Sequence, residues 1–470
     1  MPHPALDTSP PRTARSTLLE WWPEDREFWR RQGQAIARRN LWISIPALLL
    51  AFAVWMIWSV VAVRLDSLGF KFSTDQLFWL TALPGLSGAT ARIFYAFMVP
   101  VVGGRRWTVI STASLLLPTL WLGVAVQDPQ TPYGVFVLIA LLCGLGGGNF
   151  ASSMANISFF FPKSQQGSAL GLNAGLGNLG VSVMQFLAPL VITVGVLGPW
   201  AGGAQKTASG QHIYLQNAAD VWVLPIIVVT LLAWFGMNDL ASARASFRDQ
   251  MVIFKRKHQW IMSWLYTATF GSFIGFSAGF PLLIKSQFSG IDPLHYAFLG
   301  PMVGALARPF GGWLADHIGG AKLTFWNFIV MVLATLSLLL FLPHAGQGGS
   351  FLGFFLVFML LFISTGIGNG STFRMIPVIF RSEHERRAAG AGSDALQAAL
   401  LAAGKESAAA LGFSSAVAAY GAFFIPRAFG LSLSLTGGVA AALFVFSTYY
   451  LSCILLTWWF YQRAQAEIHC

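Results

Sequence analysis

The stretch Gly88-Ala89-Thr90-Ala91-Arg92 decides the architecture, because it returns as Gly304-Ala305-Leu306-Ala307-Arg308 in the second half of the chain. At the same offset of 216 residues, Gly103-Gly104 and Thr108 recur as Gly319-Gly320 and Thr324. The chain is therefore expected to contain two copies of one unit. Each copy places an arginine inside an apolar stretch, where an ionised side chain costs roughly 2.5–3.5 kcal/mol at the centre of a bilayer. Two such cations at equivalent positions predict a central site for an anion.

The composition indicates a membrane protein. Hydrophobic residues make up 55% and charged residues 10% of the chain, and the mean hydropathy is +0.63, whereas soluble domains carry about 25% charged residues. Apolar runs of about 20 residues, the length that spans a bilayer, lie near 41–63, 76–101, 108–126, 133–160, 168–198, 221–238, 259–284, 296–315, 323–342, 351–379, 407–426 and 434–461. They predict an all-α membrane protein with twelve transmembrane helices in two pseudo-symmetric six-helix bundles.

Polar segments set the domain boundaries. We expect a tail at 1–39, bundles at 40–238 and 259–462, a linker at 239–258 and a tail at 463–470. No cleavable signal peptide is visible, because the first apolar run is long enough to remain as a helix. With the amino terminus inside, 21 of the 29 Lys and Arg fall on cytoplasmic segments, as the positive-inside rule requires. Both termini are therefore expected in the cytoplasm.

Several function classes lack support. The net charge of +11 follows from the cytoplasmic bias of Lys and Arg and does not indicate a nucleic-acid partner. Cys143 and Cys453 lie in apolar spans and Cys470 ends the chain, so neither a metal site nor a disulfide framework is expected. No cofactor is expected. The charged stretch from Arg381 to Glu406 is expected to be a short surface helix or a mobile loop.

Three glycine-rich stretches carry a family resemblance. They are GLGGGNFA at 144–151, GSALGLNAGLGNLGVSVMQ at 167–185 and GIGNGSTFRMIP at 366–377. With the Gly-Gly loops, the chain resembles the nitrate/nitrite porters of the NarK type within the major facilitator superfamily. The superfamily loop usually has an acidic residue before the glycine pair. The second copy has Asp316 there and the first copy has only Val-Pro-Val-Val, so an ionic latch using that acid is expected only from the second half.

The resemblance implies nitrate and nitrite as substrates, a bacterial inner-membrane location and a monomeric carrier. It also implies that Phe150 and Phe270 sandwich the anion and that Asn178 and Tyr266 add neutral donors. The residues alone already favour Arg92 and Arg308 as the anion ligands, since a guanidinium gives two parallel hydrogen bonds to a planar oxyanion. No Asp or Glu lies in the central part of any span to neutralise them.

Glycines are expected to let helices slide. Gly167, Gly171 and Gly175 recur every fourth residue and should form one helix face that a neighbouring backbone approaches closely. Helix ten carries a second run, Gly366, Gly368 and Gly370, and Gly144 to Gly148 could bend helix four. Arg374 is close enough to the cytoplasmic end of helix ten to snorkel there; its alternative is a cationic vestibule.

The absence of a central carboxylate favours exchange over proton symport, because proton-coupled carriers commonly use an intramembrane acid. His295 and His344 lie near external ends and His317 in a cytoplasmic loop, so none is an obvious proton carrier. Nitrate entering in exchange for nitrite moves no net charge. We therefore expect nitrate/nitrite antiport. Nitrate/proton symport and another small oxyanion, such as chlorate or formate, remain alternatives within transport; an enzyme or a nitrate sensor has no supporting feature.

Overall fold

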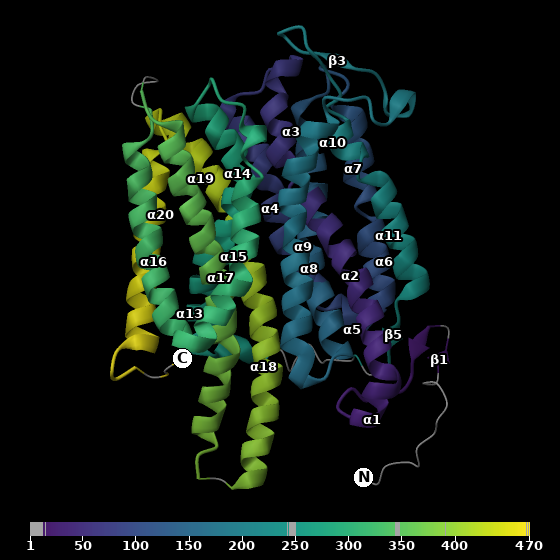
Figure 1. The fold of residues 1–470 in the computed structure, drawn as a ribbon, viewed down its shortest axis with the longest axis vertical. Helices are drawn as coiled ribbons and strands as arrows, with labels where there is room; N and C mark the ends of the chain where they lie inside the picture. The colour runs from purple at the N-terminus through teal and green to yellow at the C-terminus, as the bar shows by residue number, and fades with distance from the viewer. Residues whose placement is uncertain are drawn as a thin grey trace.

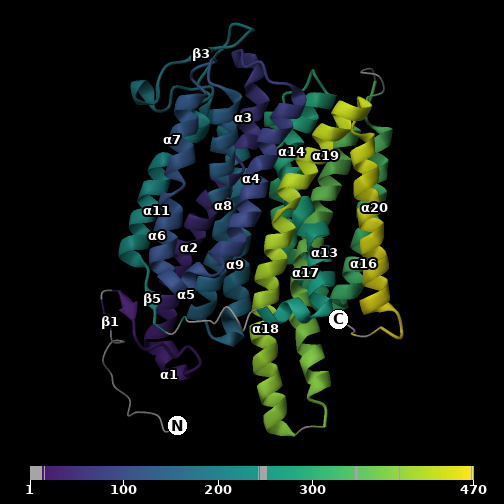
Figure 2. The same cartoon turned by 180° about the vertical axis from the view of Figure 1, so that it is seen from behind.

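The computed structural model describes residues 13–14, 16–241, 243, 251–343, 348–390, 392–466, 468 and 470. Arg244 and Arg248, expected in the linker, and His344, expected near an external end, lie outside these ranges. The described part is almost wholly helical, and its helices form two bundles that stand side by side (Figure 1 and Figure 2).

The first bundle consists of six spans, three of which are continued by a second helix after a kink, and one of which is preceded by a short helix. They are α2 (Gln34–Trp55) with α3 (Trp58–Arg64), α4 (Thr74–Tyr95) with α5 (Met98–Val102), α6 (Gly104–Ala113) with α7 (Leu116–Ala125), α8 (Tyr133–Phe160), α9 (Lys163–Val191), and α10 (Asn217–Asp220) with α11 (Val223–Gly236). The short α1 (Arg26–Phe28) and the π turn η1 (Trp29–Gly33) lead into α2.

The second bundle repeats this plan with six further spans. They are α13 (Lys257–Tyr266) with α14 (Ser272–Gln287), α15 (Leu299–Ile318), α16 (Gly320–Ser337), α17 (Phe351–Arg387), α18 (Ser393–Ala419) with α19 (Gly421–Thr436), and α20 (Ala440–Thr457). A π turn, η5 (Thr267–Gly271), joins α13 to α14, and another, η8 (Trp458–Gln462), ends α20.

Among the described residues, strands form only two small sheets, one at each end of the bundles. The strands β1 (Thr13–Ala14), β2 (Thr17–Leu18) and β5 (Asp239–Leu240) form one small sheet, in which β2 is antiparallel to β1 and parallel to β5. The strands β3 (Gln205–Lys206) and β4 (His212–Ile213) form a hairpin. Short 3-10 turns complete the connections: η2 (Asp66–Leu68), η3 (Gly198–Ala201), η4 (Met251–Lys255), η6 (Pro293–His295) and η7 (Leu338–Leu340).

Two ends of the molecule can be distinguished. The helix α1, the strand β5 and the C-terminal residue lie at one end, here called the lower end, and the β3–β4 hairpin lies at the other, the upper end (Figure 1). The helices α17 and α18 extend beyond the other helices at the lower end (Figure 1). An even number of spans between α1 and Cys470, counted over the described residues, brings these two parts of the chain to the same side.

Hydropathy alone identifies ten of the spans among the described residues. The two others, α4–α5 and α15, are the spans that carry Arg92 and Arg308. A buried arginine in a helix that also contains Gly and Pro lowers its mean hydropathy. The spans that hydropathy misses are therefore the two equivalent members of the internal repeat.

The repeated Gly-Gly pairs make the same turn in both bundles. Gly103 has φ of 98° and Gly319 has φ of 91°, a conformation that a side chain disfavours, and the next glycine begins the following helix in each case. As expected, the first copy has no acidic residue before its glycine pair, but an acid from another part of the chain takes part in this loop. Asp239, which follows α11, accepts a hydrogen bond of 2.8 Å from the backbone N–H of Arg105.

The stretch from Arg381 to Glu406 was expected to be a short surface helix or a mobile loop, and the structure differs. It forms the lower parts of α17 and α18, so the eleventh span, expected at 407–426, begins at Ser393. Alanine-rich sequence favours helix, and ion pairs at a spacing of four residues, Arg381–Glu385 and Glu383–Arg387, stabilise it. Gly390 and Gly392, both with positive φ, lie in the turn between the two helices.

Candidate functional site

Arg92 lies fully buried on α4, between the two bundles. Its Nε donates to the carbonyl oxygen of Gly147 on α8 at 3.0 Å, and its Nη1 donates to the carbonyl oxygen of Ser415 on α18 at 3.0 Å. Its third nitrogen, Nη2, has no hydrogen-bond partner among the described residues. A buried donor without a partner costs free energy, so this nitrogen is a candidate ligand for an anion.

The glycine run of α8 allows this arginine to approach. A Cβ atom on Gly147 would lie 2.7 Å from the Trp55 ring and 2.9 Å from Gly88 Cα, and one on Gly144 would lie 1.9 Å from Ser87 Oγ. These glycines therefore serve close packing of α8 against α4. The helix continues without a break from Tyr133 to Phe160.

Two phenylalanine rings stand beside Arg92. Its guanidinium carbon lies 4.8 Å from the ring centre of Phe150 and 5.5 Å from that of Phe270. The two rings are separated by 6.2 Å between centres, with an angle of 26° between their planes. Phe270 lies in the π turn η5, and such turns are frequent at functional sites because they redirect side chains.

Arg308 occupies the equivalent position on α15 and faces a different ring. It is 8% exposed, its Nη1 has no partner among the described residues, and its guanidinium carbon lies 5.2 Å from the ring centre of Phe373 on α17. Phe373 was not expected in the site. The only available signal was its position three residues after Gly370, which matches that of Phe150 after Gly147.

Tyr266 lies between Phe270 and Phe373, the rings that face Arg92 and Arg308. Its ring stacks on Phe270 at 5.6 Å between centres and lies 6.3 Å from Phe373. The side chain interacts electrostatically with both Arg92 and Arg308, and its hydroxyl has no hydrogen-bond partner among the described residues. The structure thus brings together five of the six expected binding residues, with unsatisfied donors on three of them.

Asn178 is the sixth expected residue. It is 1% exposed on α9, and its side-chain oxygen has no partner among the described residues. Among the described residues, no hydrogen bond joins Asn178 to either arginine in this conformation. Asn149 on α8 and Asn369 on α17, within the glycine-rich runs, likewise keep buried side-chain oxygens without partners, although sequence analysis did not select them.

The glycines expected to slide fall into two groups. A Cβ on Gly366 would lie 2.1 Å from the Gly304 oxygen, one on Gly370 would lie 2.2 Å from the Arg308 oxygen, and one on Gly368 would lie 2.6 Å from Thr269 and Asn327. By contrast, a Cβ on Gly167, Gly171 or Gly175 would meet nothing within 4 Å.

The close backbone approach expected at Gly167, Gly171 and Gly175 is therefore absent in this conformation. The reason is that α9 packs on α2 through another face. A Cβ on Gly177 would lie 2.6 Å from Leu48, and one on Gly180 would lie 2.1 Å from the Leu49 oxygen.

Of the two environments expected for Arg374, its half-exposed side chain agrees with snorkelling and not with an isolated cation in a vestibule. It forms an ion pair with Asp316, the acidic residue of the second Gly-Gly loop, and both side chains are about half exposed. The pair stays within the second bundle, so Arg374 is not an isolated cation in a vestibule.

Ion pairs join the two bundles at the upper end. Arg64 pairs with Asp292 at 2.5 Å, Lys285 with Asp66 at 2.5 Å, and Arg427 with Asp75 at 2.7 Å. We call these three pairs the upper latch. Lower-end pairs such as Arg105–Asp239 and Arg256–Glu406 each stay within one bundle. The conformation is therefore closed by ion pairs at the upper end.

Comparison with known protein families identifies the architecture. Residues 43–404 match the model of the Major Facilitator Superfamily. The chain belongs to the major facilitator superfamily. Within it, this porter is 55% identical over 452 residues to the nitrate/nitrite transporter NarU of Escherichia coli, with 96% of this chain and 97% of the relative covered.

Two further relatives extend the comparison. The porter is 42% identical over 468 residues to the probable nitrate/nitrite antiporter NarK2 of Thermus thermophilus, covering 98% and 100% of the two chains. It is 25% identical over 443 residues to the nitrite extrusion protein of Bacillus subtilis, covering 92% and 98%. The resemblance to NarK-type porters is confirmed, and the porter is a multi-pass inner-membrane transport protein, not an enzyme.

Proposed function

We propose that this porter exchanges nitrate for nitrite by alternating access, with the anion held between Arg92 and Arg308. The observation that carries the proposal is that both buried guanidinium groups keep a nitrogen without a hydrogen-bond partner among the described residues. No ion pair of either arginine is found there. Relatives named as nitrate/nitrite transporters and antiporter support the choice of substrates.

The aromatic side chains favour a flat ion. Phe150 and Phe270 are nearly parallel, but their 6.2 Å separation is below the roughly 7 Å that two successive van der Waals contacts need. We infer that these rings separate slightly when the anion enters between them. The hydroxyl of Tyr266, with no partner among the described residues, would donate to an anion oxygen, and Asn178 would approach the ion in another conformation.

Energetics favour exchange. Entry of a lone monovalent anion into a cell with a negative interior costs about 2.3 kcal/mol of free energy per 100 mV of membrane potential. One-for-one exchange of nitrate and nitrite moves no net charge and avoids this cost. Two buried cations without a counter-ion also make the empty carrier costly to reorient, so an anion must bind before the bundles rock. We propose that nitrate moves inward and nitrite outward.

The lower end is proposed to be the cytoplasmic end, with both termini inside, because it carries most of the Lys and Arg. In this conformation the upper latch then closes the external side. The open face at Gly167, Gly171 and Gly175 would lie along a cytoplasmic entrance. Sliding would accordingly bring α9 closer to the second bundle when the lower end closes, while Gly366, Gly368 and Gly370 let α17 move along α15.

The decisive experiment uses purified protein in sealed liposomes loaded with nitrite, with nitrate or with neither, and follows entry of labelled nitrate with and without a pH gradient. If the porter is an exchanger, uptake of labelled nitrate will depend on an internal anion and will be independent of the pH gradient. Uptake into empty vesicles driven by external acid would instead establish nitrate/proton symport. Tyr266, the titratable group between the arginines, would then be the first residue to examine as a proton carrier.

A further inference from the structure

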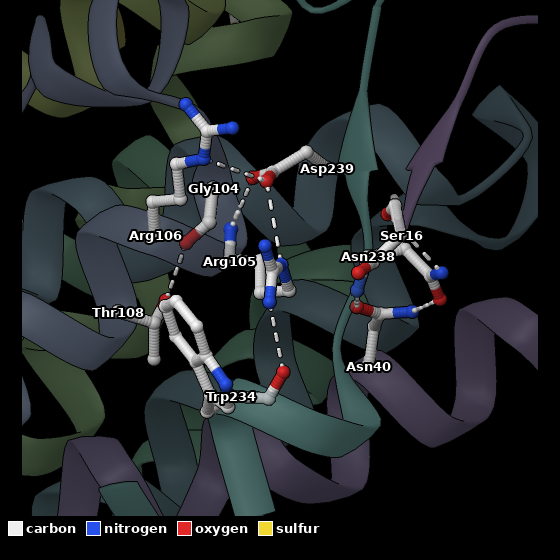
Figure 3. A network of polar contacts seen from close by, with 9 residues as sticks. All are labelled: Ser16, Asn40, Gly104, Arg105, Arg106, Thr108, Trp234, Asn238 and Asp239. Atoms are coloured by element: carbon white, nitrogen blue, oxygen red, sulfur yellow. Dashed lines mark hydrogen bonds and ion pairs between the residues drawn. The ribbon is translucent and has the colours of Figure 1, made fainter. Parts of the chain in front are cut away.

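A second basic site lies at the lower end of the first bundle, away from the arginine pair. It is centred on Asp239, which is 5% exposed (Figure 3). The backbone N–H of Arg105 donates to Asp239 Oδ1 at 2.8 Å and Arg105 Nε to Oδ2 at 3.4 Å. Arg105 Nη1 also donates to the carbonyl oxygen of Trp234 at 2.9 Å, and its guanidinium carbon lies 4.8 Å from the Trp234 ring centre. Arg105 is thus fixed inside the protein.

Arg106 has a different environment. Its Nε lies 3.9 Å from Asp239 Oδ2, and its side chain is 59% exposed, compared with 7% for Arg105. Two arginines share one carboxylate, so the cluster keeps one positive charge. Arg39 adds another cation nearby, since it donates to Asn238, the neighbour of Asp239, at 2.8 Å.

A pocket of about 580 Å³ lies beside Arg106, between the start of α6 and the end of α11. Most of its other lining is apolar, with Val109 and Ile110 on α6 and Trp234 and Phe235 on α11. Ile110 is 52% exposed and Phe235 is 80% exposed. Helix α6 begins here at Gly104 and α11 ends here at Gly236. Two membrane-spanning helices are expected to reach the membrane surface at such a position.

We propose that this pocket binds an anionic phospholipid, whose phosphate is held by Arg106 and whose acyl chains lie along Ile110 and Phe235. A guanidinium offers a planar pair of donors to a phosphate, and basic pockets between transmembrane helices suit anionic headgroups. A zwitterionic headgroup fits less well. Its ammonium group would face an arginine, and Asp239, the acid of the cluster, is buried and already paired.

The site is distinct from the transport pathway and does not depend on which anion the porter carries. It would attach the first bundle to one leaflet, because its lining comes from α5, α6 and α11 of that bundle and from Ser16 of the N-terminal arm. The contacts of Asp239 also link the pocket to the N-terminal arm, because the backbone N–H of Asp239 donates to the Ser16 oxygen at 3.1 Å. Lipid binding is therefore expected to stabilise this end of the fold.

The test uses delipidated full-length porter in detergent, with lipid binding counted by native mass spectrometry and Tm measured in parallel. Added phosphatidylglycerol should bind and raise Tm, and phosphatidylethanolamine should do so much less. Arg106→Gln should weaken phosphatidylglycerol binding roughly fivefold, as expected for one basic residue at a membrane surface. Arg38→Gln is the matched control, since Arg38 is an exposed arginine at the same end on α2.

A second variant separates lipid from free anion. Phe235→Ser removes an apolar contact and leaves the charge, so it should weaken lipid binding without changing any response to inorganic phosphate. Equal phosphatidylglycerol binding by Arg106→Gln and the wild-type porter would overturn the proposal. So would an equal effect of phosphatidylethanolamine, or a Tm rise with inorganic phosphate that matches the lipid effect and survives Phe235→Ser.

Discussion

The guanidinium carbon of Arg308 lies 5.2 Å from the ring centre of Phe373, which repeats in the second bundle the 4.8 Å approach of Arg92 to Phe150. In each bundle the arginine comes from the second span and the ring from the fourth. The internal repeat therefore extends from sequence to a pair of arginine–aromatic contacts. Tyr266 and Phe270 lie between the two pairs and belong to neither copy of the repeat motif.

Replacing Phe373 tests whether this pair takes part in anion binding. Phe373→Leu keeps an apolar side chain but removes the ring, and a desolvated cation–π contact contributes about 1–2 kcal/mol. We expect KM for nitrate to rise roughly tenfold in the liposome assay, because Arg308 loses the ring that orients it. The control is Phe358→Leu on the same helix, since Phe358 packs against four other phenylalanine rings and none of them belongs to the proposed site. It should lower Tm and leave KM near the wild-type value; a rise in KM in both variants would assign the effect to packing.

The arginines themselves can be tested by charge-conserving substitution. Arg92→Lys and Arg308→Lys should each lose most transport while remaining folded, because an ammonium cannot give a planar oxyanion two parallel hydrogen bonds. Initial rates of nitrate uptake, compared with Tm of the same purified preparations, provide the measurement. Arg92→Lys should also lower Tm more than Arg308→Lys, because Arg92 holds two carbonyl oxygens, one in each bundle. Near wild-type uptake by both variants would exclude the two-arginine site.

Much of the fold was predictable because it depends on local pattern. Apolar length, the repeated Gly-Gly turns and the two embedded arginines indicate a two-bundle membrane protein without any coordinates. The two arginines could be selected as candidates for the same reason: an ionised side chain in an apolar span is rare enough to indicate function.

The remaining features depend on which faces of the helices pack against one another. Phe373 is one of 40 phenylalanines, and only the fold places it against Arg308. Asp239 replaces the missing loop acid of the first copy across a separation of 134 residues, which no local motif reveals. Gly171 and Gly180 belong to the same glycine-rich run, yet only Gly180 meets a neighbouring backbone, because tertiary packing selects the buried face.

The contrast between the two glycine groups leads to a stability prediction. Gly370→Ala would place a Cβ 2.2 Å from the backbone oxygen of Arg308, and overpacking of this kind costs about 1–3 kcal/mol. We expect a clear fall in Tm and in transport, since the backbone that carries Arg308 must shift. Gly171→Ala meets open space and should leave Tm unchanged or slightly raised. An equal loss of Tm in both variants would contradict the packing described for α17 and α15.

The upper latch predicts how the conformational equilibrium responds to surface charge. Asp66→Asn combined with Asp292→Asn removes one partner from two of the three pairs that join the bundles. The Arg64 and Asp292 side chains are each 28% exposed, so screening by water limits the contribution of each pair to about 1 kcal/mol or less. The loss of one pair should therefore change the equilibrium constant between the two conformations by at most roughly fivefold. Because the lost contacts stabilise the state closed at the upper end, the population should move toward the opposite state.

Labelling reports this shift. A cysteine at Gly171 has room in the present conformation, and its reaction with a membrane-impermeant maleimide from the lower side should slow in the double variant. Asp128→Asn is the control, since Asp128 lies in the connection between α7 and α8 at the same end and accepts a hydrogen bond from Gln130 within its own turn. Unchanged labelling in the double variant would mean that the upper latch does not set the equilibrium. Faster labelling would mean that the double variant favours the state closed at the upper end. Contacts other than these ion pairs would then stabilise that state.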